Sequence, residues 1–342
     1  MKPWLLPLLL LAEVIFFTAI GDHPPFRSLA GLISYLQNYS GDLLAQSAPV
    51  LLLGFGMTVV ISTAGIDLSV GSMAALVACV MSSFQAGTTF WCTAVPLGLA
   101  LAVTLGLTNG ALIAWLDIPP IIATLGTMIF YRGLCYVVMG DVEKAPFLDV
   151  SGYEWFGQFL GAALFVALLF LAGGLLYQHS RWRREILMLG GNRVAARYAG
   201  IPVPRRICEV YALMGLAAFL AALCFTARNS SVSASSLNGL ELHVIVAVVL
   251  GGTRVQGGAG SLAGTFFGVL IIAVLDEGLR GATGWGDRHL PFKISHLEHL
   301  LLGTLLVAGV WLNTRWARSN RIGARRSRRF TIPKATGRPF RE

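Results

Sequence analysis

Long apolar segments recur along this chain, and they constrain its fold more than any other feature. A helix needs about 20 mostly apolar residues to cross the hydrocarbon core of a bilayer. Ten segments are candidates for such spans: 3–20, 43–65, 70–86, 89–116, 121–139, 156–177, 207–227, 240–251, 261–280 and 296–313. The eighth is the weakest, because ten apolar residues rise only about 15 Å. It is either extended by its flanks or a half-span that ends in the glycine-rich turn at 251–260.

Composition supports the same interpretation. The mean hydropathy is +0.70 and only 13% of residues are charged, about half the usual share of a soluble domain. The run at 3–20 resembles a signal peptide but lacks a clear cleavage site, so it is interpreted as a retained first helix. The predicted fold class is all-α, a polytopic integral membrane protein with about ten transmembrane helices.

The net charge of +9 is concentrated in two basic segments. Seven of the 26 basic residues lie in 181–206 and ten in 314–342, with one acid in each segment. Basic loops in an apolar chain indicate the cytosolic side of a membrane, and neither segment has the interleaved aromatic residues of a nucleic-acid groove. No nucleic-acid partner is expected, and the tail is expected to touch membrane lipid headgroups.

The number of spans determines the topology. With a cytosolic N-terminus, ten spans place both basic segments in the cytosol and the acidic loop at 140–155 outside. The predicted organisation is a transmembrane domain at 1–313 with a cytosolic loop at 178–206, followed by a flexible basic tail at 314–342. Ten spans also divide into two five-helix halves, which must then be inverted relative to each other.

Asp67 lies in the segment GIDLSVGS (65–72), where the second candidate span ends and the third begins. A carboxylate is costly in hydrocarbon, so this side chain should face water, protein or free backbone amides. Asp67 and Ser69 are both suitable N-cap residues for the third span. The alternative is a role for them in gating or in the solute pathway.

Two more polar residues fall inside predicted spans, Asn109 in the fourth and Arg132 in the fifth. A central arginine costs about 2.5–3.5 kcal/mol to insert, so structural pairing or snorkelling to the interface is the expected role of Arg132. Together with Asp67 and Ser69, these residues are the candidates for a pathway or gating role. Asp276 and Glu277 end the ninth span.

The basic loop contains a short helix pattern, LGGNRVAARYAGI (189–201). Asn192 followed by alanines, with Gly200 at the far end, predicts a capped helix of about two turns. Ala195 and Ala196 would let such a helix approach a groove on a soluble partner. A solvated amphipathic connector is the alternative.

The stretch GGTRVQGGAGS (251–261) is rich in glycine but lacks the Gly-Lys-Ser/Thr ending of a phosphate-binding loop. It is interpreted as a tight cytosolic turn. No catalytic motif and no metal-ligand spacing occurs in the sequence, so no cofactor is expected in this chain, and nucleotide hydrolysis would belong to another one.

Small residues recur at Gly106 and Gly110 and again at Gly260, Gly264 and Gly268, a pattern typical of close helix packing.

Together these stretches resemble the permease subunits of ATP-binding-cassette sugar importers, the ribose, xylose and autoinducer-2 permease family. The resemblance covers about residues 45–313 and rests on Gly56–Gly71, Thr108–Gly126 with Arg132-Gly133, Gly190–Ile201 and Glu241–Gly268.

The resemblance implies ten spans per subunit, a pair of permease subunits (identical or paralogous), two cytosolic ATPase subunits that use ATP and Mg, and a periplasmic solute-binding protein. It places the protein in the bacterial inner membrane and implies that Gly191–Gly200 is the coupling helix seated on the ATPase, with Gly191, Asn192, Ala195, Ala196 and Gly200 as its residues. His243 and Val246 depart from the family pattern, which leaves the solute open.

Three alternatives remain. A branched-chain amino acid permease of related architecture would share most features except GIDLSVGS. An ion-coupled secondary transporter should carry paired carboxylates within the membrane, and Asp67 has no obvious partner in the sequence. A membrane-embedded enzyme would need a motif such as H-E-x-x-H or G-x-S-x-G, and neither occurs.

Overall fold

The structure is a computed structural model. It describes residues 5–20, 29–84, 90–140, 142–145, 150–281 apart from 151, 154, 156 and 158, and 297–315 apart from 298, 299, 312 and 313. The predicted basic tail therefore lies almost entirely outside the described residues, and so does part of the predicted acidic loop at 140–155.

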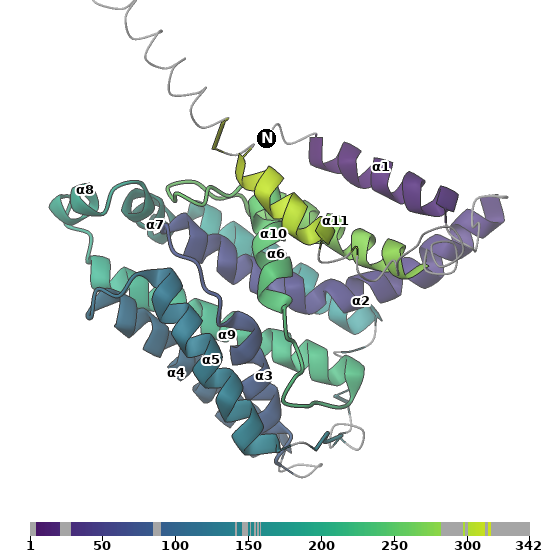
Figure 1. The fold of residues 1–342 in the computed structure, drawn as a ribbon, viewed down its shortest axis with the longest axis horizontal. Coiled ribbons are helices and arrows are strands. Elements are labelled where there is room, and N and C mark those ends of the chain that lie inside the picture. Colours follow the sequence, from purple (N-terminus) through teal and green to yellow (C-terminus); the bar gives the residue numbers. More distant parts are fainter. Residues whose placement is uncertain are drawn as a thin grey trace, which may run out of the picture.

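Helices account for the regular secondary structure of the described residues, apart from one antiparallel bridge between Lys144 and Val232. Figure 1 shows them in this order: α1 (Leu5–Ile20), α2 (Leu29–Ser62), α3 (Val70–Met81), the π-helix η2 (Phe90–Ala94), α4 (Val95–Ala114), α5 (Pro120–Met139), α6 (Phe159–His179), α7 (Arg181–Gly191), α8 (Arg193–Tyr198), α9 (Val203–Asn229), α10 (Leu240–Leu250) and α11 (Leu262–Gly281). A further apolar helix covers Leu300–Trp311.

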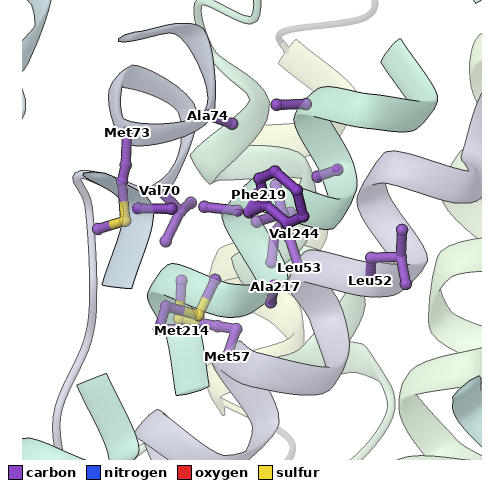
Figure 2. Packing of buried hydrophobic residues seen from close by; sticks show 14 of the residues in the cluster. Leu52, Leu53, Met57, Val70, Met73, Ala74, Met214, Ala217, Phe219 and Val244 are labelled. Atoms are coloured by element: carbon purple, nitrogen blue, oxygen red, sulfur yellow. The ribbon is translucent and has the colours of Figure 1, made fainter. Parts of the chain in front are cut away.

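The centre of the bundle is formed by α2, α3, α9 and α10. Figure 2 shows side chains of these helices meeting there, among them Met57 of α2, Met73 of α3, Phe219 of α9 and Val244 of α10. The apolar windows of α2 and α9 are 83% and 72% buried within the protein, whereas those of α4 and α5 are 33% and 28% buried. The first two are therefore inner helices, and the other two leave most of their surface for lipid or another subunit.

Each of the ten predicted apolar segments coincides with an apolar helix. Five helices in the described residues are long and apolar enough to cross a membrane: Ala45–Ser62, Phe90–Ala114, Pro120–Met139, Val203–Asn229 and Leu262–Arg280. Five shorter apolar helices occupy the other positions: Leu5–Phe17, Val70–Met81, Leu168–His179, Leu240–Leu250 and Leu300–Trp311. A helical polytopic membrane protein is confirmed, and the count of ten spans stays a prediction.

Two boundaries differ from the sequence-based prediction. α2 begins at Leu29, 14 residues before the predicted span at 43–65, because hydropathy detects the apolar part of a helix and not its polar extension. α10 has 11 residues and ends at Leu250, so it rises about 16 Å, half of the hydrocarbon core. Of the two possibilities for this segment, the half-span is the one observed.

The recurring glycines allow helix backbones to touch, as predicted. A Cβ atom on Gly106 of α4 would lie 2.2 Å from the Tyr211 carbonyl oxygen of α9. A Cβ atom on Gly268 of α11 would lie 2.0 Å from the Ala247 carbonyl oxygen of α10. Because lipid provides no hydrophobic drive between helices, such close contacts account for much of the packing.

Candidate coupling and solute sites

The chain breaks between α2 and α3, and the fully buried Asp67 lies in this break. One carboxylate oxygen of Asp67 accepts hydrogen bonds from the Ser69 amide at 2.9 Å and from the Ser69 hydroxyl at 2.7 Å. The side-chain amide of Asn109, on α4, donates to the same hydroxyl at 2.8 Å. The three residues therefore form a hydrogen-bonded chain that joins the break to α4.

The predicted capping of α3 by these side chains is wrong in its details. Ser69 occupies the N-cap position, but its side chain accepts no hydrogen bond from an amide of the helix. Its hydroxyl instead donates to Asp67, which pairs with the amide of Ser69 itself rather than with the first turn. A buried carboxylate accepts hydrogen bonds only, so it takes the hydroxyl proton that lies closest to it.

Arg132 is held by backbone carbonyls. Its guanidinium donates to the carbonyl oxygens of Ala234 and Ser236, each at 2.8 Å. Both acceptors belong to the connection between α9 and α10. Structural pairing is therefore the observed role, and a pathway or gating role for Asp67, Ser69, Asn109 or Arg132 stays a prediction.

The basic loop folds into two short helices, α7 and α8, which lie together at one edge of the molecule in Figure 1. The side-chain oxygen of Asn192 accepts the Ala195 amide proton at 3.0 Å, which confirms the predicted cap. Gly200 follows α8 with a φ of 79°, a conformation that favours glycine. Gly191 ends α7 instead of belonging to the capped helix.

The two alanines of α8 face different surroundings. Ala196 is fully buried against this protein's own core, whereas Gly191, Asn192, Ala195 and Gly200 are exposed. The hypothesis that Ala196 meets a partner is therefore wrong, because its methyl group packs inward. The large apolar or aromatic side chains that α8 exposes are Val194, 64% accessible, and Tyr198, 89% accessible.

A cluster of ion pairs fastens α7 to the first turns of α9. Arg206 of α9 bonds to Glu185 of α7 at 2.6 Å and to Glu209 of its own helix at 2.6 Å. The Trp182 indole of α7 donates to Glu209 at 2.8 Å, and the more exposed Arg205 pairs with the same carboxylate at 2.9 Å. We call Trp182, Glu185, Arg206 and Glu209 the clamp.

The end of α7 also touches α2 and the glycine-rich turn. A Cβ atom on Gly190 would lie 1.9 Å from the carbonyl oxygen of Ser62, which is the last residue of α2. The Gly258 amide donates to that same carbonyl at 3.0 Å. Three separate segments therefore meet at a point where only glycine fits, which we call the junction of Ser62, Gly190 and Gly258.

A cavity of about 480 Å³ lies at the far end of α9 from the clamp and beside the middle of α2. It is lined by Gln46, Pro49, Val50, Phe225, Arg228, Asn229, Leu237, Asn238, Leu240, His243, Asp276 and Arg280. Gln46 precedes Ser62 of the junction by 16 residues of α2, a rise of about 24 Å. The short helices α7 and α8 and the cavity thus lie toward opposite ends of α9.

Most residues of this cavity were not recognised from the sequence. His243 stood out as a departure from a family pattern and Asp276 as a polar residue at the end of a span. Gln46, Arg228 and Arg280 gave no signal, because they come from helices far apart in sequence and each reads as an ordinary polar residue at a helix end. The described residues contain no group of three or more His, Cys, Asp or Glu side chains that could hold a metal ion.

The protein is thus a bundle of apolar helices with two short helices, α7 and α8, at one end of α9 and a cavity at its other end. A family model described as "Branched-chain amino acid transport system / permease component" matches residues 40–310. The chain belongs to this family. As a permease component it is a transport subunit, and ATP hydrolysis belongs to a separate chain.

Curated relatives are named as import permeases, two of the following three for sugars. The ribose import permease protein of Escherichia coli K12 is 36% identical over 290 residues, which cover 81% of this chain and 87% of the relative. A fructose import permease protein of Rhizobium meliloti is 33% identical over 81% of this chain and 77% of its own length. An autoinducer 2 import system permease protein of Yersinia enterocolitica is 33% identical over 66% of this chain and 70% of its own length. No solved structure matches the chain.

Asp67→Leu is expected to destabilise the protein, because it leaves the buried Ser69 amide without its acceptor. An unsatisfied buried group costs about 1–3 kcal/mol, so the thermal unfolding midpoint in detergent should fall clearly. Asp67→Asn should stay near the wild type, since its side-chain oxygen can still accept both hydrogen bonds. An Asp67→Leu protein that unfolds at the wild-type temperature would show that these bonds do not support the break.

Proposed function

We propose that this chain is the permease subunit of an ATP-driven importer that moves a sugar or sugar-like solute across the bacterial inner membrane. The observation that carries the proposal is the 36% identity to a ribose import permease over 81% of the chain. The architecture supports it, because the proposed cytosolic helices α7 and α8 and the cavity lie toward opposite ends of the inner helix α9.

The proposed partner at the cytosolic end is an ATPase subunit, which would use the ATP and Mg. Val194 and Tyr198 project from α8 with most of their surface accessible, next to Ala195, whose small side chain leaves room for a partner. Exposed apolar and aromatic residues on a short helix are suited to a groove on a soluble protein. The clamp would then transmit a displacement of α7 and α8 to α9.

The other proposed partners are a second permease subunit, the same chain or a paralogue, and a periplasmic solute-binding protein. The weakly buried surfaces of α4 and α5 provide area for a second subunit or for lipid. Both termini are proposed to be cytosolic, because the segments at 181–206 and 314–342 hold most of the basic residues. The tail would then touch anionic lipid headgroups.

A branched-chain amino acid is the second candidate solute, because the matching family model is described by that class. The two candidates differ in chemistry. A sugar presents many hydroxyl groups to a polar cavity, whereas leucine or valine needs an apolar pocket for its side chain. The polar lining of the cavity, with Gln46, Asn229 and Asn238 among its residues, favours the hydroxylated solute.

Uptake into proteoliposomes tests the proposed function. The permease, its ATPase subunit and its binding protein are reconstituted with radiolabelled ribose, fructose or leucine as probes. We expect ATP-dependent uptake of a sugar and none of leucine. Uptake of leucine alone would favour the second candidate, and uptake driven by an ion gradient without ATP would contradict the proposed class.

Substitution on the outer face of α8 tests the proposed ATPase contact. Val194→Glu and Tyr198→Glu should leave the permease folded, because both positions are exposed, yet release the ATPase during purification. Tyr198→Phe keeps the aromatic surface and should retain the ATPase. Ala196→Glu should instead lower the stability of the permease itself, because it buries a charge. Full retention of the ATPase by both glutamate variants would place the contact elsewhere.

A further inference from the structure

The cavity between the middle of α2, the ends of α9 and α11 and the start of α10 has the size of a binding site. Its volume of about 480 Å³ lies within the range of about 300–1,000 Å³ that is usual for small-molecule sites. Its wall includes the start of the short helix α10. Discontinuous helices often mark solute sites in transporters.

Two lining residues on different helices lie close together at this wall. The Nε2 atom of His243, on α10, lies 3.6 Å from a carboxylate oxygen of Asp276, on α11. The Nδ1 atom of the same ring lies 3.2 Å from the Gly239 carbonyl oxygen, just before α10. These contacts place the imidazole and the carboxylate side by side at the cavity wall.

The remaining polar lining offers donors and acceptors together. The side-chain amide of Gln46 is oriented so that its oxygen faces the Arg280 guanidinium. This oxygen accepts hydrogen bonds from two guanidinium nitrogens, at 2.7 and 3.2 Å. Asn229 and Asn238 add side chains that can each donate and accept. Pro49 has no amide proton, so α2 lacks the helical hydrogen bond to the Ala45 carbonyl at this wall.

The apolar part of the lining comes from Phe225, Val50, Leu237 and Leu240. A hydroxyl group both donates and accepts, and the carbon skeleton of a polyol has an apolar face that packs on such side chains. A mixed lining therefore suits a neutral, hydroxylated molecule better than a purely apolar or a strongly anionic one.

The segment before α10 is contacted from two other helices. Arg132 of α5 bonds to the Ala234 and Ser236 carbonyls. A Cβ atom on Gly71, at the start of α3, would lie 2.7 Å from the Leu237 carbonyl oxygen. Asn238 and His243 are thus positioned by contacts outside the cavity, which leaves their side chains to shape its lining.

We infer that this cavity binds the transported solute, a neutral hydroxylated molecule of monosaccharide size, and that the paired His243 and Asp276 are its specificity-determining contacts. This inference rests on the proposed function, because it identifies where in the permease the imported solute is recognised.

Protection from thiol labelling tests whether the cavity is occupied. Asn238→Cys places a thiol in the lining, and Ser235→Cys places one on the same connection but outside the lining. Both variants are made with Cys92 and Cys208 replaced by serine, because these two are the native cysteines that are not buried. In the reconstituted complex, ribose or fructose should slow labelling at position 238 and leave labelling at position 235 unchanged.

Substitution of His243 tests the specificity contact in the same assay. His243→Ala should raise the sugar concentration needed for half-maximal protection about tenfold, the effect of losing one hydrogen-bonding contact. His243→Gln can still donate and accept, so it should recover part of the protection. A purely structural role would change thermal stability in His243→Ala and leave that concentration unchanged.

The outcomes separate this inference from the proposed function. If the wild-type complex takes up a sugar but neither sugar protects position 238, or both positions are protected equally, the cavity is not the site. If the wild-type complex takes up no sugar at all, the proposed function fails and this inference fails with it. Protection at position 238 alone that weakens in His243→Ala supports the site.

Discussion

The structure depends on the pairing of backbone groups where α2 and α10 end, because a buried backbone group without a partner costs free energy. Two such stops occur, the break between α2 and α3 and the turn between α10 and α11. A hydrogen bond joins them, because the Gly258 amide of the turn donates to the carbonyl oxygen of Ser62, the last residue of α2. Next to them, the hydroxyls of Thr58 on α2 and Thr265 on α11 are 2.6 Å apart. The two stops therefore form one interlocked unit in the protein interior.

This unit joins the end of the protein that carries α7 and α8 to the cavity. Gly190 places the end of α7 directly on Ser62, and the clamp fixes the same helix to α9. The inner helices α2 and α9 then run from these contacts to Gln46 and Asn229 in the cavity lining. A displacement of α8 by a bound ATPase would thus reach the solute site through two packed helices instead of through a flexible loop. This physical continuity is what the proposed function requires of a permease.

Local patterns in the sequence predicted local features well. The positions of the apolar helices, the Asn192 cap and the close glycine contacts all follow from residue type and spacing, which act over a few residues. The sequence did not show which face of the short helix α8 is buried. Ala196 was therefore predicted to be exposed, although it is buried. The clamp and the cavity were missed because their members come from distant segments. His243 and Asp276 lie close together only because α10 and α11 pack side by side.

The role of the clamp is tested most directly by the number of solute molecules imported per ATP hydrolysed. This ratio is measured for the reconstituted Arg206→Ala protein, with Arg205→Ala as its control. Arg206 bonds to both Glu185 and Glu209, whereas Arg205 is 75% exposed and pairs only within α9. The account predicts that Arg206→Ala retains the ATPase and its hydrolysis but imports about tenfold less solute per ATP, while Arg205→Ala stays near the wild type. An Arg206→Ala protein with the wild-type ratio would show that the clamp does not transmit movement from the cytosolic helices to α9.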